Sequence, residues 1–496
     1  MSTSSDSAIE GLRATAKTGK CENVFFRQTQ LKFLHDVLRA NSSQLETALE
    51  DDTSVSTAEA AAEVALSLSI VKEHYMSLDP KNELEREYRV AKNQDAIDRR
   101  KPWGVVYIEP QLKHTPLFSV ISPLSASLAA GNVVAIKLEK NLRALPSLLR
   151  KLLPGALEQD TFATVPSSPS PEVLSSCLEL LQDSTSSNPR YSQLASYTAP
   201  PVVAIVDRSA DLPSAAQNLV TARFAFGGSS PYAPDIILVN EFIAKPFLEL
   251  VLQNAIRFLA TASRPNPARQ NGTAHKSQDN VFRALTSIQE NKDWKINIVS
   301  KGDAGAIIEL TPTVSASGIP GKISQPIFAI STITSPDHAI DLLSQAEPPS
   351  AAYYFAEPSH AKYLDQFVAS KVSFTNHIPA QLLLGPAAPL HQIFDLEKRY
   401  ATEHFTRAAP AFVRSSVSQE RLALALSRKD QHLAQVLLRD AAKEIKEAKR
   451  AEWIARGFFE NGIFIGLGIY GVPILSCVGA AIFFGVRSGL RALGRI

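Results

Sequence analysis

The stretch Ser122-Pro-Leu-Ser-Ala-Ser-Leu-Ala-Ala-Gly-Asn-Val-Val-Ala-Ile-Lys137 decides the fold class of this 496-residue chain. Its first half continues an apolar run that begins at Thr115 and favours a buried helix. Ala130-Gly131 ends that run, because glycine interrupts helical patterns. The next residues, 132–136, are the short branched apolar run of a buried strand. A helix followed at once by a buried strand predicts an α/β sheet.

The same alternation extends outward from this stretch. Residues 8–95 have apolar positions at helical spacing and an Ala-rich segment, and they predict an N-terminal helical region. The composition shifts over residues 162–201: the stretches 166–171 and 184–189 are rich in Ser and Pro and predict loops or weakly ordered linkers, and a helix is expected over 172–181. Further buried strands are expected at the following places: 102–108, 202–206, 235–239, 327–333 and 351–355.

Composition excludes several classes of protein. Lys and Arg number 51 and Asp and Glu 49, a balance that argues against a protein that coats nucleic acid. Hydrophobic residues make up 45% of the chain, which excludes global disorder. Cys21, Cys177 and Cys477 can build neither a disulfide framework nor a zinc cluster, so no metal is expected. The N-terminus lacks the apolar run of a secretory signal, and we expect the main body in the cytosol.

The C-terminal region predicts a membrane anchor. Residues 461–486 carry no charge, and about 20 apolar residues suffice to cross a bilayer. Basic residues lie on both sides, so the segment is either a tail anchor that spans once or a re-entrant hairpin bent at Pro473. The endoplasmic reticulum is the expected membrane, with the mitochondrial outer membrane or the peroxisome as alternatives.

Before the anchor, residues 418–459 predict one long amphipathic helix, which is either solvated or paired in a coiled coil.

The order of four blocks resembles the aldehyde dehydrogenase superfamily, nearest to its class 3, fatty-aldehyde type with a C-terminal membrane segment. These blocks are 101–108, 122–137, 204–212 and 233–239. The resemblance implies an α/β, aldehyde dehydrogenase-like fold with a Rossmann-type cofactor domain and an α/β catalytic domain. We expect the following organisation: a helical region over 1–100, a degenerate cofactor domain over 101–205, a catalytic-type domain over 206–400, the amphipathic helix over 418–459 and the anchor over 461–486.

The resemblance also implies a chemistry that needs a cysteine nucleophile, a glutamate base and an asparagine that stabilises an oxyanion. Counting from the matched blocks puts Pro231 at the nucleophile position, with Ser229 and Ser230 beside it. Tyr197 falls at the glutamate position, and His114 falls at the asparagine position. Proline offers neither a thiol nor a backbone N–H. No activating base for a serine is visible nearby in the sequence.

Of the positions that the family uses to bind its cofactor, some are retained in this sequence and others are replaced. Lys137, which in the family contacts the adenosine ribose or its phosphate, is retained, and NAD or NADP therefore stays possible. Lys322 stands where the family has the acid that holds the nicotinamide ribose. Glycine turns that the family uses around the cofactor have no counterpart. Cys177 is expected to pack rather than to react.

Three functional hypotheses follow. The first is a membrane-anchored pseudoenzyme that binds a lipophilic ligand or pairs, as a homodimer or with an active related dehydrogenase, through the family's dimer surface. The second is an active NAD(P)-dependent oxidoreductase that converts a lipophilic aldehyde to a carboxylic acid with an altered site including Ser230, Lys137 or Tyr197. The third is a structural membrane adaptor built on the helix over 418–459.

Overall fold

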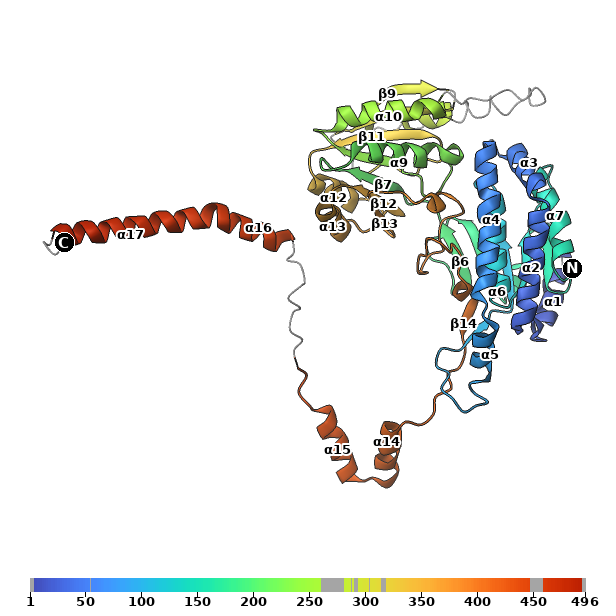
Figure 1. Cartoon of the computed structure of the whole chain (residues 1–496). Helices are drawn as coiled ribbons and strands as arrows, with labels where there is room; N and C mark the ends of the chain where they lie inside the picture. The colour runs from blue at the N-terminus through green and yellow to red at the C-terminus, as the bar shows by residue number, and fades with distance from the viewer. Residues whose placement is uncertain are drawn as a thin grey trace. The chain divides into compact units, whose positions relative to one another are not determined.

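The computed structural model describes residues 4–53, 55–259, 281–286, 288–289, 293–302, 304–313, 318–446 and 458–492. The chain divides into two compact units, Met1–Arg414 and Ser415–Ile496, and each is described by itself (Figure 1). The first unit contains a five-stranded parallel sheet, a seven-stranded mixed sheet and the N-terminal helices. The α/β class expected from the sequence is therefore confirmed.

Five helices open the first unit, as the helical spacing predicted. They begin where side chains satisfy the free N–H groups of the first turn: Asn23 accepts from Phe25 and Phe26, and Ser56 forms a capping box with Glu59. The elements are α1 (Ser4–Ala16), η1 (Lys20–Glu22), α2 (Val24–Ala40), α3 (Ser42–Asp52), α4 (Thr57–Ser77) and α5 (Pro80–Tyr88).

The first sheet has five parallel strands in the order β4-β3-β2-β5-β6. Val106 faces a core built with α2, α4 and α6, whereas Val105 and Tyr107 face α1 on the other side. Both faces are buried, which explains the unbroken apolar runs of these strands. The elements are β2 (Val105–Glu109), α6 (Pro116–Ala129), β3 (Val133–Lys137), α7 (Ala144–Ala156), β4 (Phe162–Val165), α8 (Pro171–Leu174), β5 (Leu178–Ser184) and β6 (Gln193–Tyr197).

The loops predicted over 166–171 and 184–189 are confirmed, except that Pro171 begins α8 and Ser184 ends β5. The residues on either side of these loops form strands that the sequence did not predict. They supply three of the five strands, and the helix expected over 172–181 ends at Leu174. Leu178 and Leu180 instead pair with Val106 and Ile108 of β2, so tertiary pairing overrides the local helical spacing. The connection from β5 to β6, residues 185–192, contains no helix, although adjacent parallel strands usually need a longer crossover.

The second sheet has seven strands in the order β13-β12-β7-β8-β11-β10-β9, all parallel except β9. It includes β7, so the expected domain boundary at residue 205 falls inside a strand of this sheet rather than between the sheets. Its elements are β7 (Val202–Val206), α9 (Leu212–Phe224), η2 (Ala225–Gly228), β8 (Ile236–Asn240), α10 (Ala244–Leu259), β9 (Trp294–Gly302), β10 (Gly305–Pro312), β11 (Ile327–Ile333), α12 (Pro336–Ser344), β12 (Ala351–Phe355), α13 (Pro358–Phe367), β13 (Ser373–Thr375) and η4 (Ala380–Leu383).

A small antiparallel ribbon completes the first unit. β1 (Arg100–Pro102) pairs with β14 (Thr406–Ala408), just after η5 (Thr402–Phe405). The ribbon ties the end of the first unit back to the start of the five-stranded sheet.

Residues 417–441 of the second unit form two helices where one was predicted over 418–459. α14 (Val417–Arg428) ends at Lys429, whose φ of 50° is left-handed, and α15 (Gln431–Ala441) begins after Asp430, whose carboxylate accepts from the N–H of Leu433. The left-handed C-cap at Lys429 is followed directly by the N-cap at Asp430. The helix is therefore interrupted here, although the apolar spacing continues. Residues 447–457 lie outside the described part of the chain.

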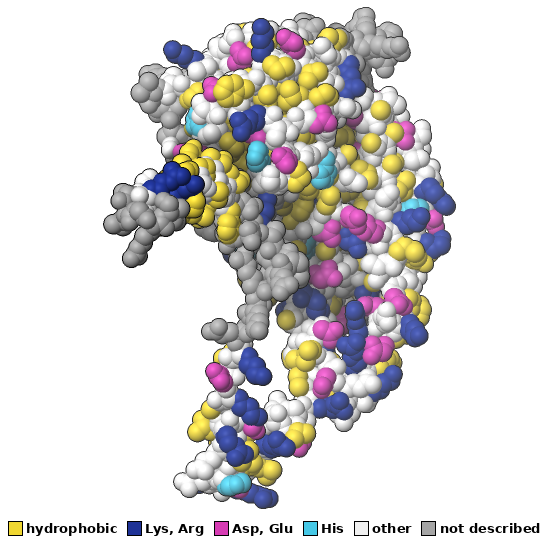
Figure 2. Space-filling model, turned by 60° about the vertical axis from the view of Figure 1, so that its left-hand side comes forward, with side chains coloured by type: hydrophobic (Ala, Val, Ile, Leu, Met, Phe, Trp, Pro, Cys, Tyr) yellow, Lys and Arg dark blue, Asp and Glu magenta, His cyan; other side chains and the backbone are white. Residues whose placement is uncertain are grey.

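The last helical segment passes through Pro473 without folding back. α16 (Phe458–Gly466), a π-helical turn (η6, Leu467–Gly471) and α17 (Val472–Ala492) follow one another, and Figure 1 shows them as one rod. Proline cannot donate a backbone hydrogen bond, and the π turn just before it accommodates that loss. Gly462–Arg491 is long and apolar enough to cross a membrane, with a mean hydropathy of 2.0. Hydrophobic side chains cover this helix, and basic side chains lie at its end (Figure 2).

Candidate functional site

His114 and Ser229 meet between the two sheets, although 115 residues separate them in the chain. His114 lies in the connection between β2 and α6, and Ser229 follows η2. Nδ1 of His114 lies 2.9 Å from Oγ of Ser229, and Nε2 lies 2.8 Å from the carbonyl oxygen of Leu383. A carbonyl only accepts, so Nε2 carries the proton and Nδ1 offers a lone pair. Burial lowers the pKa of His114 to about 4, and the ring is neutral at physiological pH.

The loop that carries Ser229 is held in an uncommon conformation. Phe226, Gly227 and Gly228 have φ values of 51°, 61° and 68°, in the left-handed region that glycine tolerates and phenylalanine does not. A carboxylate oxygen of Glu59 on α4 accepts from the N–H of Phe226 at 2.6 Å. The hydroxyl of Ser229 donates to the carbonyl oxygen of Phe226 at 2.7 Å.

The residue before α6 is strained as well. Thr115 has a φ of 39°, an outlier for a β-branched residue, and its hydroxyl oxygen accepts from the N–H of Gly385 at 2.8 Å. The edge of the His114 ring contacts Phe226, with ring centroids 5.7 Å apart. Strained residues therefore lie on both sides of the His114–Ser229 contact, and such residues gather at functional sites.

Pro231, at the expected nucleophile position, is held by a lysine. Nζ of Lys322 donates to the carbonyl oxygen of Pro231 at 2.6 Å and lies 3.0 Å from a carboxylate oxygen of Asp235. Asp235 is fully buried and also accepts from the N–H groups of Val202 and Ile323, at 2.7 and 2.9 Å. Burial lowers the pKa of Lys322, while the Asp235 carboxylate acts in the opposite direction.

A second buried cation shares Asp235. Arg223 is fully buried, with a guanidinium nitrogen 3.4 Å from the carboxylate, and it donates to the carbonyl oxygens of Pro234, Gly228 and Ile323. Desolvation lowers the pKa of Arg223 to about 10. Carbonyl oxygens thus stabilise the second positive charge. This cluster fixes the backbone on both sides of the 229–231 loop.

The carboxyl edge of the five-stranded sheet is the kind of edge where dinucleotide phosphates bind to helix N-termini. Here the first-turn N–H groups are bonded within the chain. Glu63 accepts from Leu117 and Phe118 of α6, at 2.7 and 3.1 Å. Asp52 accepts from both Ala144 and Leu145 of α7, at 2.8 Å each.

The remaining crossovers of this sheet follow the same pattern. Asp6 of α1 accepts at 2.8 Å from the N–H of Ser170, the residue before the four-residue helix α8. The β5–β6 connection supplies no helix. Among the described residues, then, the helix N-termini of this edge are occupied by carboxylates of the chain itself.

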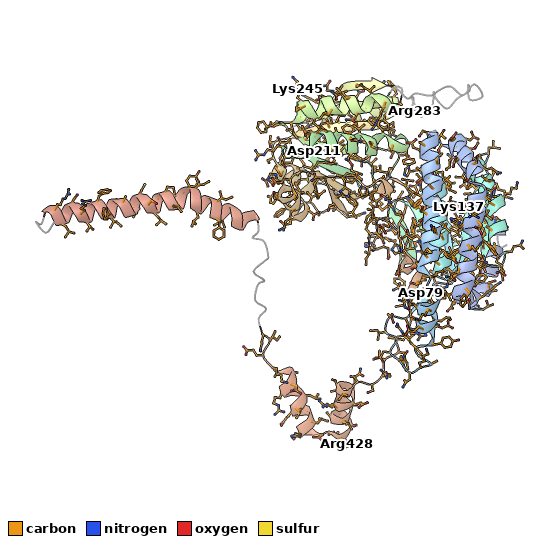
Figure 3. All side chains as sticks on the ribbon, viewed as in Figure 1. Asp79, Lys137, Asp211, Lys245, Arg283 and Arg428 are labelled. Atoms are coloured by element: carbon orange, nitrogen blue, oxygen red, sulfur yellow. The ribbon has the colours of Figure 1, made fainter. Side chains whose placement is uncertain are left out.

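Lys137 ends β3 at this edge and is labelled in Figure 3. Its ammonium group lies 3.0 Å from a carboxylate oxygen of Glu109, the last residue of β2. Glu109 also accepts from the hydroxyl groups of Tyr107 and Ser168, at 3.2 and 3.4 Å. An internal ion pair therefore neutralises the charge that was expected to meet a ribose or phosphate.

The other predicted site residues lie apart from this centre. Tyr197 ends β6, and the Lys371 ammonium lies 5.7 Å from the centre of its ring. Ser230 is buried, and its Oγ accepts from the N–H of Tyr232 rather than from His114. Cys177 is buried before β5, and burial raises the pKa of its thiol. Within the described ranges, no three His, Cys, Asp or Glu side chains gather as metal ligands would.

Sequence reasoning missed the base beside Ser229. It found no such group near the serines along the chain, whereas the structure brings His114 to Ser229 across the two sheets. One signal pointed there: counting from the matched blocks gave His114 the position of the asparagine that stabilises the oxyanion, and put Ser229 beside the nucleophile position. The buried pairing of Lys322 with Asp235 had no comparable signal.

Comparison with known proteins agrees with this architecture. A sequence profile described as the aldehyde dehydrogenase family matches residues 3–171. Aldehyde dehydrogenase family 3 member B1 of Rattus norvegicus is 26% identical over 376 residues, which cover 71% of this chain and 78% of that protein. The 4,4'-diaponeurosporen-aldehyde dehydrogenase of Staphylococcus aureus is 24% identical over 393 residues, which cover 73% of this chain and 82% of that protein.

Solved structures show the same fold. The substrate-bound state of Staphylococcus aureus AldH has a TM-score of 0.62 and 17% identity, covering 83% of this chain and 94% of that one. The NADP complex of GapN, a glyceraldehyde-3-phosphate dehydrogenase of Methanocaldococcus jannaschii, has a TM-score of 0.61 and 15% identity, covering 82% and 93%. The expected fold and the resemblance to family 3 are both confirmed. The match over residues 3–171 and the shared fold thus make this chain similar to the aldehyde dehydrogenase family.

Proposed function

We propose that this chain is a membrane-anchored member of the aldehyde dehydrogenase family that does not oxidise aldehydes and acts by binding a partner. The observation that carries the proposal is the edge of the five-stranded sheet where α6 and α7 begin. Their N-terminal N–H groups are bonded by Glu63 and Asp52. A dinucleotide diphosphate would have to displace both carboxyl groups, or bind against the negative charge of Asp52 and, above about pH 7, that of Glu63, whose pKa burial raises to about 7.

The residues present therefore do not fit a nicotinamide dinucleotide. Lys137 is paired with Glu109, and the last crossover of the sheet has no helix to present N–H groups to a phosphate. Lys322 stands at the position of the acid that would hold the nicotinamide ribose. It offers no acceptor to a ribose hydroxyl, and its ammonium group is paired with Asp235.

The catalytic position supports the same proposal. Pro231 has no thiol, and its carbonyl oxygen is bound by Lys322. Tyr197, at the position of the expected base, contacts Lys371. A thiohemiacetal needs a nucleophilic sulfur, and Cys177 is buried away from this loop with a raised thiol pKa.

The kind of partner is indicated by a groove of about 820 Å³ at the amino edge of the same sheet. Charged side chains line it, among them Arg27, Glu83, Arg100 and Lys101. A groove with both signs of charge suits a protein surface better than an aliphatic chain. We therefore favour pairing, either as a homodimer or with an active related dehydrogenase, over a lipophilic small-molecule ligand.

The C-terminal helix gives the proposed location. Gly462–Arg491 would span a membrane once as a tail anchor, leaving the main body in the cytosol. The endoplasmic reticulum is the membrane we propose. An anchor of this kind would place the partner at the same membrane surface.

The alternative function is an active oxidoreductase with an altered site, which would convert a lipophilic aldehyde to a carboxylic acid. The retention of Lys137 at the end of β3 favours it. The name of the Staphylococcus aureus relative, which specifies a 4,4'-diaponeurosporen-aldehyde, is consistent with a lipophilic substrate.

Titration of the full-length protein in lipid nanodiscs with NAD and NADP separates these functions. We expect no binding by calorimetry at millimolar cofactor, and no NADH or NADPH formation with a panel of long-chain aldehydes. The rat family 3 member B1 protein serves as the positive control under the same conditions. Micromolar binding would overturn the proposal, and aldehyde turnover that Lys137→Ala abolishes would establish the alternative.

A further inference from the structure

The two helices that precede the membrane helix keep large apolar side chains in solvent. α14 and α15 contact each other and Ala425 is buried, yet Leu422 is 51% exposed and Leu426 is 72% exposed. These two leucines are four residues apart and therefore lie on the same face of α14. Leu438 of α15 is exposed as well. Apolar side chains gathered on so short a segment indicate a surface that something else covers.

Positive charge accompanies these leucines, and Figure 2 shows basic side chains beside hydrophobic ones on the two helices. Residues 417–446 contain six Lys and Arg against four Asp and Glu. Asp430 already caps α15, and Asp440 is paired with Lys443 at 3.0 Å. The cations that form no ion pair with a described residue are Arg421, Arg428, Lys429 and Arg439. Free guanidinium groups suit lipid phosphates, because the planar fork binds two oxygen atoms at once.

The chain keeps this helical pair close to the membrane helix. Residues 442–457 join Ala441, the end of α15, to Phe458, the start of α16. A segment of that length reaches at most about 55 Å. Such a tether holds a weakly binding surface at a high effective concentration near the bilayer, so that modest contacts suffice. A partner that must diffuse in from solution gains no such advantage.

On its other side the helical pair follows the first unit directly. The N–H of Arg414 donates to a carboxylate oxygen of Asp95 at 2.8 Å, and Nε of Arg414 lies 3.6 Å from the same carboxylate. Residues 415 and 416 then lead into α14. A surface that holds α14 therefore also limits how far the first unit can move away from that surface.

We propose that α14 and α15 lie in the headgroup layer of the membrane that Gly462–Arg491 crosses. Leu422 and Leu426 enter the edge of the acyl chains, and the arginine side chains extend to the phosphates of anionic lipids. This inference rests on the membrane anchor of the proposed function and adds to it a second contact that depends on the lipid. The cytosolic leaflet is the expected surface, because anionic lipids are concentrated there.

Hydrogen–deuterium exchange of the full-length protein in nanodiscs tests this contact. One set of discs contains phosphatidylcholine alone, and the other contains phosphatidylcholine with roughly one third phosphatidylserine. We expect the amides of α14 and α15 to exchange about tenfold more slowly in the anionic discs. High salt should reverse most of that difference, because it screens the charge of the headgroups.

Two aspartate substitutions on α14 provide a matched test. Leu426→Asp places a charge on the proposed membrane face and should abolish the slow exchange. Leu424→Asp lies on the opposite side of the helix, since successive residues are about 100° apart, and it should keep the slow exchange. Both leucines are exposed, at 72% and 42%, so neither substitution removes a core side chain.

The possible failures are distinguishable. Equal exchange in the two kinds of disc would overturn the inference, whether it is fast, as for a solvated helical pair, or slow, as for leucines covered by a second copy of the chain. Equal effects of the two substitutions would overturn it as well. A protein that does not co-elute with the discs would refute the anchor itself, whereas an inserted protein with fast exchange over α14 and α15 would refute only this contact.

Discussion

At the scale of one residue, the buried side chain of Glu63 caps the first turn of α6 from another helix of the chain. The side chain is 1% exposed and accepts two N–H groups at the start of α6, yet no cation contacts it among the described residues. Desolvation outweighs those hydrogen bonds and raises the pKa of Glu63 to about 7. The carboxyl group therefore binds a proton more tightly in the folded protein than in the unfolded chain, where its pKa is about 4.3.

The sign of the resulting pH dependence follows from this difference. Between about pH 4.5 and 7 the folded state holds more protons, so the free energy of unfolding falls as pH rises through that window. In Glu63→Gln the side chain keeps an acceptor and does not titrate. The stability of wild type relative to this variant should fall by roughly 3 kcal/mol from pH 4.5 to 7.5. Urea unfolding at each pH measures it, and parallel curves for the two proteins would contradict the assignment.

How far single residues could be predicted depends on where their partners lie in the chain. His114, Pro231 and Lys322 could be assigned positions because each sits near a recognisable block. Their partners could not be found, because Ser229 is 115 residues from His114 and the Asp235 carboxylate reaches Lys322 from a different strand connection. Pairings of this kind exist only after two sheets have packed.

At the scale of an element, the turn over 225–229 offers a matched test of strain. Gly227 and Gly228 have similar left-handed φ values of 61° and 68°. A Cβ on Gly227 would meet no heavy atom within 4 Å, whereas one on Gly228 would lie 2.8 Å from the backbone of Pro326.

Alanine substitutions at Gly227 and Gly228 should therefore separate the cost of a left-handed backbone from the cost of a steric clash. Gly227→Ala should lower the free energy of unfolding by about 1 kcal/mol, the cost of a left-handed alanine. Gly228→Ala should lower it by a further 1–3 kcal/mol or so, because backbone atoms must move apart. Chemical denaturation of both variants checks the difference. Equal decreases in the free energy of unfolding would mean that the backbone at Pro326 moves away from the new Cβ at no cost.

The elements show which sequence signals were strong. Apolar periodicity located the N-terminal helices and the central strands, where propensity and burial agree. It failed over 162–201, because Ser and Pro in short turns hid three strands whose stability comes from pairing with β2 and β3. It failed again over 418–459, where the apolar spacing continues past Lys429 but the helix α14 ends at Arg428.

At the scale of the whole molecule, the two units should be separable. The first, Met1–Arg414, contains both sheets and their cores. A chain truncated after Arg414 should keep the thermal unfolding midpoint of the full-length protein and remain in the aqueous phase. The full-length chain should partition into detergent because of Gly462–Arg491. Phase partitioning and calorimetry measure the two properties, and a lower midpoint after truncation would show that the second unit stabilises the first.

The helix-free connection between β5 and β6 also has a consequence for the order in which the first sheet assembles. Glu179 pairs with Gln193, a separation of 14 residues, whereas Val105 pairs with Val133 across 28 residues and Val106 with Leu178 across 72. Each doubling of a closed loop costs about 0.6 kcal/mol in chain entropy. The β5–β6 pair therefore has the smallest entropic barrier of the sheet, and it is the pair on which the other strands can add. The short connection therefore gives the first sheet a local folding nucleus.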